Sequence, residues 1–289
     1  MAKAAYTLYR LAGLLVPRLP ARPGYALCRA AGGLGYRFNR RARATIRQNI
    51  RRVAGPDAPP QEIDRLTRLA FNHVLYNYFD LFRLPALGRD AVDKLVTVHG
   101  WDNVEQALAA GKGIVMTSAH LGNIEVVLTA MLLRGLSITI PVERIEPPEL
   151  FDYVTRLRTS QGLQLIPIDG PLLPLLRTLK KGGVAGLAGD RDITRTGQVI
   201  PFFGHPARMP DGHVRLALKT GAPLVLGFSH RNPNHTYQAR FLPPYNPPQH
   251  GTEEEQVAAA LAYVVQQLEQ AIAQAPEQWT VTVSVWENP

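Results

Sequence analysis

The chain has 289 residues and a formal net charge of +9, and 46% of its residues are hydrophobic while 19% are charged. This length and composition suit one large α/β domain, or two small ones, with a sizeable core, and they exclude a disordered chain. The single cysteine, Cys28, excludes an internal disulfide framework and a cysteine-based zinc ribbon.

The positive charge is concentrated at the N-terminus. Residues 1–56 contain twelve basic residues and no acidic residue, so the rest of the chain has 20 basic and 23 acidic residues and a net charge of −3. Such asymmetry indicates an anionic partner, either a membrane surface or a nucleic acid. No helix-turn-helix, RNP or zinc-finger pattern occurs, and we therefore expect no nucleic acid partner.

The N-terminal region has the pattern of helices that lie on a membrane. Residues 1–85 are predicted to be helical, with tyrosine, leucine and phenylalanine interspersed with arginine, and prolines 17, 20 and 23 break the first segment. No run of about 18 apolar residues occurs, and no convincing cleavage site follows the apolar stretch 11–17, so neither a transmembrane helix nor a secretory signal is expected. The alternative is an N-terminal helix packed on the core with a solvated basic face.

Strand and helix patterns alternate after a predicted helix that follows Pro60. The expected strands cover residues 113–117, 137–141, 163–168, 184–188 and 223–228, and 279–286 is a weak candidate for a last strand. The expected helices cover residues 121–134, 148–161, 171–181, 210–220 and 252–274. This alternation predicts an α/β fold with a central, largely parallel mixed sheet flanked by helices. We expect a membrane-associating region over residues 1–85 and an α/β core over 86–289, within one structural domain.

The strongest signal for chemistry lies between Gly113 and Glu125, where an apolar strand ends in a turn of small residues before His120. Catalytic residues in open α/β sheets gather at the carboxyl ends of strands. If Glu125 on the following helical turn points back at the His120 imidazole, it would fix the tautomer and stabilise the imidazolium. No G-x-S-x-G elbow occurs, so this pair would act on a substrate hydroxyl.

Two other interpretations of His120 compete with a catalytic one. A lone histidine is more often a hydrogen-bonded structural residue, and the strand-turn-helix context only balances that tendency. A metal site is not expected, because His120 and Glu125 lack a third spaced ligand and no H-E-x-x-H motif occurs.

An ordered set of blocks points to one family. HLGNIE at 120–125 fits the pattern H-x₄-E/D. The further blocks are RARATIRQNIRR at 41–52, GDRD at 189–192, TG at 196–197, PFFG at 201–204, the segment 207–225 and PEQW at 276–279. In this order and spacing the chain resembles the lysophospholipid acyltransferase superfamily, in the branch of lipid A late acyltransferases and phosphatidylinositol mannoside acyltransferases. The resemblance covers nearly the whole chain.

The resemblance implies a mechanism. His120 would deprotonate an acceptor hydroxyl, which attacks the thioester of acyl-CoA or acyl carrier protein, while Glu125 orients and charge-balances His120. In some relatives the carboxylate comes from the later block, so Asp190 or Asp192 could share or replace the role of Glu125. The chain departs from the branch after Trp279, where it reads TVTVSVW instead of aromatic and basic residues.

The candidates for substrate binding come from the same blocks. Backbone amides around Gly122 and Asn123 could stabilise an oxyanion. Arg191 could bind an anionic group of the acceptor or pair with a neighbouring aspartate, and Arg144 could bind a headgroup or CoA phosphate or be merely solvated. The full set is Gly122, Asn123, Arg144, Asp190, Arg191, Asp192, Phe202 and Phe203, with the two phenylalanines as pocket wall or core.

The leading hypothesis is a peripheral enzyme at the cytoplasmic face of the bacterial plasma membrane. It would move a fatty acyl chain from acyl-CoA or acyl carrier protein to a hydroxyl of a glycolipid or lysolipid, with no cofactor beyond this co-substrate. The block GDRDITRTG favours a phosphatidylinositol mannoside-type acceptor over a lipid A-type one. The alternatives are an acyl-thioester hydrolase and a non-enzymatic protein that binds anionic lipid.

Overall fold

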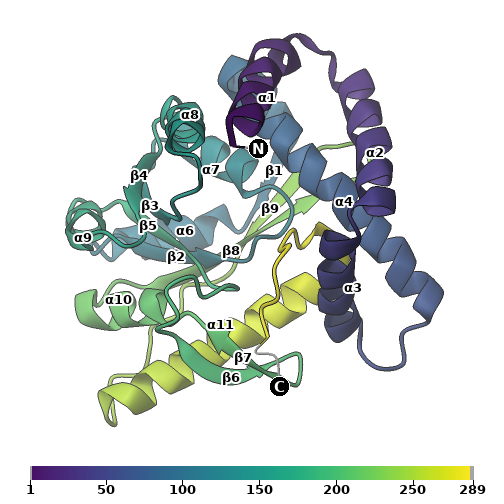
Figure 1. The fold of residues 1–289 in the computed structure, drawn as a ribbon. Coiled ribbons are helices and arrows are strands. Elements are labelled where there is room, and N and C mark those ends of the chain that lie inside the picture. Colours follow the sequence, from purple (N-terminus) through teal and green to yellow (C-terminus); the bar gives the residue numbers. More distant parts are fainter. Residues whose placement is uncertain (1, 287–289) are drawn as a thin grey trace.

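The computed structural model describes residues 2–286 and is built around a sheet (Figure 1). Within these residues the sheet has seven strands in the order β1-β9-β8-β2-β5-β3-β4. They are β1 (Val96–His99), β2 (Ile114–Ser118), β3 (Ile138–Val142), β4 (Gln164–Pro167), β5 (Val184–Ala188), β8 (Leu224–Arg231) and β9 (Tyr237–Phe241). All neighbouring pairs are parallel except β8 and β9. The predicted largely parallel mixed sheet is confirmed.

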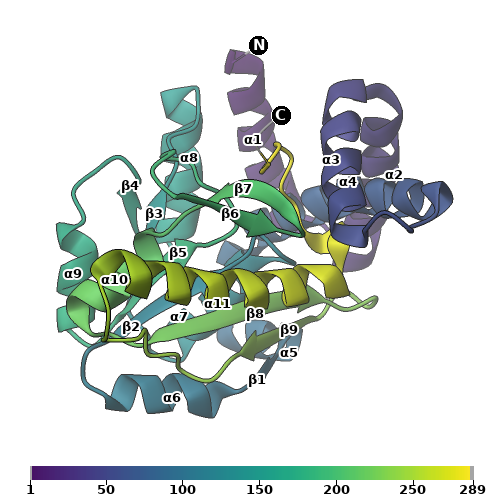
Figure 2. The ribbon, with the colours of Figure 1, turned by 90° about the horizontal axis from the view of Figure 1, so that it is seen from below.

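Helices cover both faces of the sheet. One apolar core contains side chains of α5 (Arg89–Leu95), α6 (Trp101–Ala109) and α7 (Ile124–Leu133). The core on the other face contains side chains of α9 (Leu173–Lys180), α10 (Gly212–Thr220) and α11 (Glu253–Gln274). Figure 2 shows α11 running along that face. The central strand β2 is covered on both sides, which explains why its sequence is continuously apolar instead of alternating.

The N-terminal residues form four helices, in agreement with the helical pattern. They are α1 (Ala2–Leu15), α2 (Ala21–Phe38), α3 (Arg40–Ala54) and α4 (Pro60–Arg83), with a 3₁₀ turn at Val16–Arg18. Pro17 and Pro20 separate α1 from α2, whereas Pro23 lies in the first turn of α2, where a missing N–H costs nothing. In the part of the chain that the structure describes, no helix combines the length and apolar character needed to cross a bilayer.

A buried ionic cluster joins α4 to the sheet. The Asp80 carboxylate on α4 accepts a hydrogen bond from the Arg231 guanidinium at 2.8 Å and one from the Tyr25 hydroxyl of α2 at 2.5 Å. The Tyr237 hydroxyl on β9 also donates to it. Because a buried charge without a partner is very costly, this cluster fixes α2 and α4 against β8 and β9.

The domain boundary that the sequence predicts at residue 85 stays a prediction.

The structure differs from the sequence prediction at several places, and the helices α5 and α6 and the edge-side strands β1 and β9 were not predicted. The expected strand over 279–286 is wrong: this segment makes only isolated bridges, from Trp279 to Leu121 and from Trp286 to Ala207. Its carbonyl groups at Val281 and Val283 accept hydrogen bonds from the side chain of Asn49, so no ladder forms. The hairpin of β6 (Gln198–Phe202) and β7 (His205–Met209), which packs beside α11, was not predicted.

The helix α8 (Pro148–Thr159) lies between the N-terminal helices and the sheet. It contacts α1 and α4 on one side and β4 on the other. This position makes α8 one wall of the cavity described below.

Candidate active site

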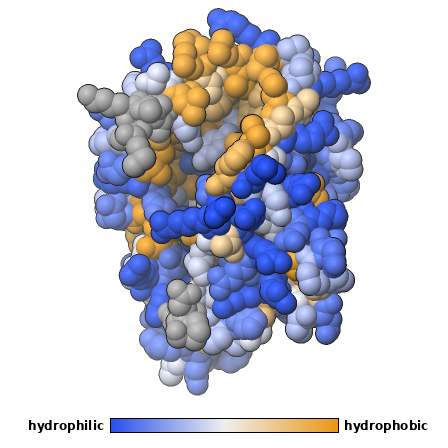
Figure 3. Space-filling model, turned by 45° about the vertical axis from the view of Figure 1, so that its right-hand side comes forward, coloured by the Kyte–Doolittle hydropathy of each residue, from blue (hydrophilic) through white to orange (hydrophobic). Residues whose placement is uncertain are grey.

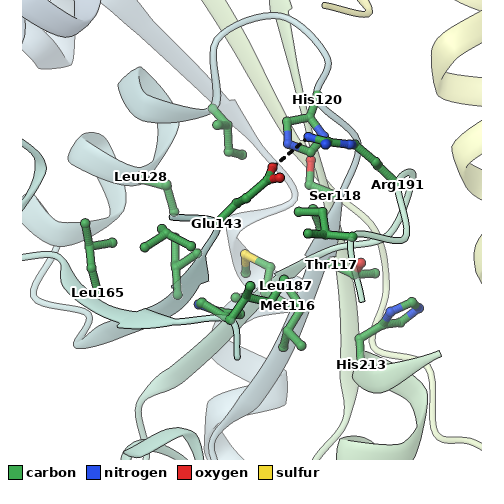
Figure 4. A pocket seen from close by; sticks show the side chains of 18 of the residues that line it. Met116, Thr117, Ser118, His120, Leu128, Glu143, Leu165, Leu187, Arg191 and His213 are labelled. Atoms are coloured by element: carbon green, nitrogen blue, oxygen red, sulfur yellow. Dashed lines mark hydrogen bonds and ion pairs between the residues drawn. The ribbon is translucent and has the colours of Figure 1, made fainter. Parts of the chain in front are cut away.

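His120 lies at the mouth of a cavity at the carboxyl end of the sheet (Figure 4). β2 ends at Ser118, and the His120 side chain, two residues further on, is 40% exposed. The cavity has a volume of about 540 Å³. Its aliphatic wall includes Ile124, Val127, Leu128, Met131, Ile140, Leu165 and Leu187. A cavity with this lining suits a long apolar ligand.

The imidazole of His120 is paired with Asp190. His120 Nδ1 donates to Asp190 Oδ1 at 2.8 Å, and the backbone N–H of His120 donates to Oδ2 at 2.8 Å. The strand register explains this meeting: Ser118 of β2 lies opposite Ala188 of β5, so the residues two positions beyond each strand end face one another. Two parallel strands therefore deliver the base and its carboxylate to one point.

The pair shifts the pKa of both groups. The negative charge of Asp190 raises the pKa of His120 above its ordinary value, against the opposing effects of burial and of the positive charges of Arg191 and Arg158. Burial by itself would raise the pKa of Asp190, but the charge of His120 and the hydrogen bonds from His120 and Trp279 hold it below its ordinary value. Asp190 is therefore ionised and holds the proton on Nδ1, which leaves Nε2 as the proton acceptor.

The expected contact between Glu125 and His120 is wrong. Glu125 accepts a hydrogen bond from Arg158 Nε at 2.9 Å, and a second guanidinium nitrogen lies 2.7 Å from its other oxygen. α7 begins at Ile124, so its first turn directs Glu125 toward α8 and away from the imidazole. Of the two alternatives, Asp190 contacts His120, whereas Asp192 caps the turn at 194–197 by accepting backbone N–H groups.

The oxyanion role expected for the amides of Gly122 and Asn123 is also wrong. The N–H of Gly122 donates to the Gln278 carbonyl at 3.0 Å, and the N–H of Asn123 donates to the Ser229 hydroxyl at 3.2 Å. Gly122 has φ +61°, and a Cβ there would lie 2.4 Å from the Ser229 carbonyl oxygen, so only glycine fits. Asn123 caps α7 by accepting from the N–H of Glu125. Both residues shape the loop after His120 and do not line the cavity.

The two candidate arginines occupy different places. Arg191 lines the cavity and lies beside His120 at its mouth, where its guanidinium is 3.0 Å from Glu143 (Figure 4). Arg144 points away, is paired with Asp169 at 3.4 Å, and does not line the cavity. The expectation that Arg144 binds substrate is therefore not met in this cavity.

The two phenylalanines do not form the pocket wall. Phe202 is fully buried and stacks on Trp286 with ring centroids 5.5 Å apart, on the α11 side of the sheet. Phe203 packs against the same core, and its backbone N–H donates to the Glu269 side chain. The core interpretation of these residues is the correct one.

Three polar residues of the site were not singled out by the sequence. Arg158 and Glu143 line the cavity, and Trp279 donates its indole N–H to Asp190 Oδ2 at 2.8 Å. The block PEQW already contained a signal for Trp279, because a tryptophan there is out of place in an otherwise polar turn. No comparable signal marked Arg158 or Glu143, whose role depends on how α8 and the end of β3 pack.

A histidine held by a buried aspartate lies at the end of a parallel strand and opens on an apolar cavity. Such an arrangement can take a proton from a hydroxyl beside a long apolar ligand. Residues 2–287 match the family model described as "Bacterial lipid A biosynthesis acyltransferase". The chain belongs to this family.

Two mycobacterial relatives show which members of the family the chain resembles. A phosphatidylinositol mannoside acyltransferase of Mycobacterium tuberculosis is 33% identical over 187 residues, which cover 62% of this chain and 58% of the relative. The protein of the same name from Mycolicibacterium smegmatis is 31% identical over 206 residues, which cover 69% of this chain and 67% of the relative. The chain thus spans somewhat more than half the length of the first of these relatives.

Among solved structures, the chain is similar to the 1-acyl-sn-glycerophosphate acyltransferase PlsC from Thermotoga maritima. The likeness has 16% sequence identity and a TM-score of 0.37, and it covers 66% of this chain and 81% of that chain. A likeness this weak carries no argument about the site.

Proposed function

We propose that this protein is a membrane-associated acyltransferase that moves a fatty acyl chain from a thioester, acyl-CoA or acyl carrier protein, to a hydroxyl of a glycolipid. The observation that carries the proposal is the His120–Asp190 pair at the mouth of an apolar cavity of about 540 Å³. The names of the mycobacterial relatives support an acceptor of the phosphatidylinositol mannoside type, with a lipid A-type acceptor as the next choice.

The chemistry follows from the protonation states of the pair. His120 Nε2 removes the proton from the acceptor hydroxyl as its oxygen attacks the thioester carbonyl, and Asp190 stabilises the imidazolium that forms. When the tetrahedral intermediate collapses, the C–S bond breaks and the imidazolium returns the proton to the thiolate that leaves. The products are the acylated lipid and the free thiol.

The cavity and its mouth would bind different parts of the donor. The aliphatic wall would take the hydrocarbon chain, which gains roughly 0.8 kcal/mol for each buried CH₂ group. Arg158 and Arg191 place positive charge beside His120, where the polar part of a donor or acceptor must lie. Both guanidiniums already face carboxylates, so an anionic substrate would compete with Glu125 and Glu143.

The proposal is tested with purified protein, isotope-labelled palmitoyl-CoA or palmitoyl carrier protein, and a panel of glycolipids and lysolipids, read by mass spectrometry. We expect an acylated glycolipid and an equimolar amount of free thiol. Free fatty acid without an acylated lipid would instead identify a thioesterase. Binding to anionic vesicles with no turnover of either donor would favour the non-enzymatic alternative.

The surface of α1 and α2 supports peripheral attachment to a membrane. Leucine side chains on α1 and large apolar side chains on α2 are at least half exposed, and they are Leu8, Leu11, Leu14, Leu15, Leu27, Leu34 and Phe38. Figure 3 shows an apolar patch gathered at the end of the molecule where these helices lie. Arginines accompany it, and apolar groups framed by cations suit an anionic lipid surface. Because acyl-CoA and acyl carrier protein are cytosolic thioesters, the proposed reaction would take place at the cytoplasmic face.

Exposed leucines of α1 provide a test of membrane attachment. The double variant Leu11→Asp with Leu15→Asp is expected to lower binding to vesicles rich in anionic lipid at least tenfold, because burying one leucine contributes about 1.5–3 kcal/mol. Flotation of the protein with vesicles measures the bound fraction. The matched control is Val199→Asp with Val283→Asp, at similarly exposed apolar positions elsewhere. Equal losses in both variants would contradict attachment through α1.

Glu125 is expected to act on substrate binding, because it contacts Arg158 and makes no contact with the imidazole. In Glu125→Gln the ion pair to Arg158 weakens, so an anionic substrate no longer competes with a carboxylate for that guanidinium. We therefore expect KM for the thioester to fall while the pH at which His120 loses its proton stays unchanged. Steady-state kinetics across pH measure both quantities. An acid or alkaline displacement of the pH profile would show that Glu125 serves His120 after all.

A further inference from the structure

The C-terminal segment after α11 runs beside the loop that carries His120. The 3₁₀ turn η3 (Pro276–Gln278) places the Gln278 carbonyl against the N–H of Gly122 at 3.0 Å. The N–H of Thr280 donates to the His120 carbonyl at 2.9 Å, and its hydroxyl donates to the same oxygen at 3.2 Å. Between these contacts, Trp279 and Leu121 form an antiparallel bridge. The segment thus pairs with the backbone from His120 to Gly122.

Trp279 extends this pairing to Asp190. Its indole Nε1–H donates to Asp190 Oδ2 at 2.8 Å, and its side chain is 2% exposed. The ring packs edge-on against Phe202 and Trp286, with centroids 6.0 and 5.9 Å away. Neighbours on two sides fix the indole in one orientation, so its N–H is a preorganised donor.

Among residues 2–286, the hydrogen bonds that Asp190 accepts come from His120 and Trp279. Oδ1 faces the Nδ1 of His120, and Oδ2 accepts from the backbone N–H of His120 and from Trp279. Asp190 is fully buried, so water does not replace a lost donor without opening the core. A buried carboxylate with three donors stays ionised and cannot rotate freely. Removing one donor raises the pKa of the carboxyl group and allows it to rotate more freely.

We propose that Trp279 is a positioning residue for the reaction: its indole N–H fixes the Asp190 carboxylate so that Oδ1 faces His120 Nδ1 and the imidazole presents Nε2 to the cavity. This inference rests on the proposed function, because it assigns Trp279 a part in that same site. The segment after α11 thereby supports the His120–Asp190 pair, whose members lie about 160 and 90 residues earlier in the chain.

The test is Trp279→Phe, which keeps an aromatic ring and removes the N–H. Without that donor the Asp190 carboxylate is less screened and more basic, so it stabilises the imidazolium more strongly and the pKa of His120 rises. We expect kcat at neutral pH to fall about tenfold or more, with KM little changed and the pH profile displaced to higher pH. NMR titration of the His120 ring signals measures its pKa without any turnover.

Trp286→Phe is the matched control. Trp286 is equally buried, packs on the same Phe202 ring, and donates its indole N–H to the Phe202 carbonyl at 2.9 Å. Phenylalanine keeps an aromatic ring against Trp279, so Trp286→Phe should lose comparable stability and leave the pKa of His120 unchanged. Equal kinetics in the two variants with an unmoved His120 pKa would overturn the proposal and leave Trp279 as packing.

A second replacement covers the case in which Trp279→Phe does not fold. Benzothienylalanine at position 279 preserves the shape of the indole and replaces the N–H by sulfur, so only the hydrogen bond to Asp190 is lost. The same rise in the pKa of His120 is expected. Because the NMR measurement needs no substrate, failure of the acyl-transfer assay would count against the proposed function and leave the positioning role separately testable.

Discussion

Replacing His120 with alanine is expected to lower acyl transfer by about 10³-fold or more, because it removes the proton acceptor that Asp190 holds at the cavity mouth. The guanidinium groups of Arg158 and Arg191 are donors only, and they hold the carboxylates of Glu125 and Glu143 in ion pairs. The His120 side chain is 40% exposed, so its truncation leaves the core intact. Product formation from labelled palmitoyl-CoA, followed with circular dichroism of both proteins, measures the effect.

The control for this variant is His205→Ala. His205 is an exposed histidine in β7, outside the cavity, and its loss should leave both activity and fold unchanged. Transfer that persists at near wild-type rate in a folded His120→Ala protein would contradict the base mechanism. His120→Ala is expected to retain vesicle binding, because His120 lies just beyond the end of β2 whereas the apolar patch lies on α1 and α2.

Local sequence patterns were sufficient to locate the sheet strands nearest the site. The run 113–117 predicted β2 within one residue, and 184–188 matched β5. Continuous apolar runs bounded by glycine are typical of buried parallel strands, and both strands lie at the centre of the sheet. The exposed hairpin β6–β7 lacks such a run and was missed, and the alternation at 279–286 indicated a strand where side-chain contacts replace a ladder.

The partner of His120 illustrates what local sequence cannot determine. Proximity along the chain favoured Glu125, five residues away, but a helix beginning at Ile124 turns that carboxylate toward α8. Asp190 is 70 residues away and meets His120 because β2 and β5 are neighbours in a register that pairs Ser118 with Ala188. Register between strands follows from the packing of the whole sheet, so the sequence could offer Asp190 only as an alternative taken from family resemblance.

The same reasoning explains the misplaced binding residues. Gly122 and Asn123 occur where a helix begins, a position with unpaired N–H groups that suggested an oxyanion site. Those N–H groups are instead satisfied by Gln278 and Ser229, which approach from 106 or more residues away. Contacts of this range are invisible in the sequence pattern, and they convert a potential binding site into a structural support for His120.

Replacing Asp190 with asparagine is expected to lower kcat/KM by about 10³- to 10⁴-fold and to displace the pH profile toward acid. The direction of this displacement follows from the charges. Asp190 raises the pKa of His120 above 6.5, so in the wild type the base form appears only at higher pH. Without the negative charge the imidazolium is less stable, the pKa of His120 falls, and the base form is present at lower pH. Activity is nevertheless lost, because an amide donating to Nδ1 selects the tautomer that carries its proton on Nε2.

The pH dependence of kcat/KM measures both effects, and Asp211→Asn provides the matched control. Asp211 is another buried aspartate, paired with Arg215 at 2.8 Å instead of with a histidine, so its replacement reports the cost of losing a buried charge alone. It should reduce stability without moving the pH profile. If Asp190→Asn kept the wild-type profile and lost no more activity than Asp211→Asn, the carboxylate would have no part in catalysis, and His120 would have to act without a charged partner.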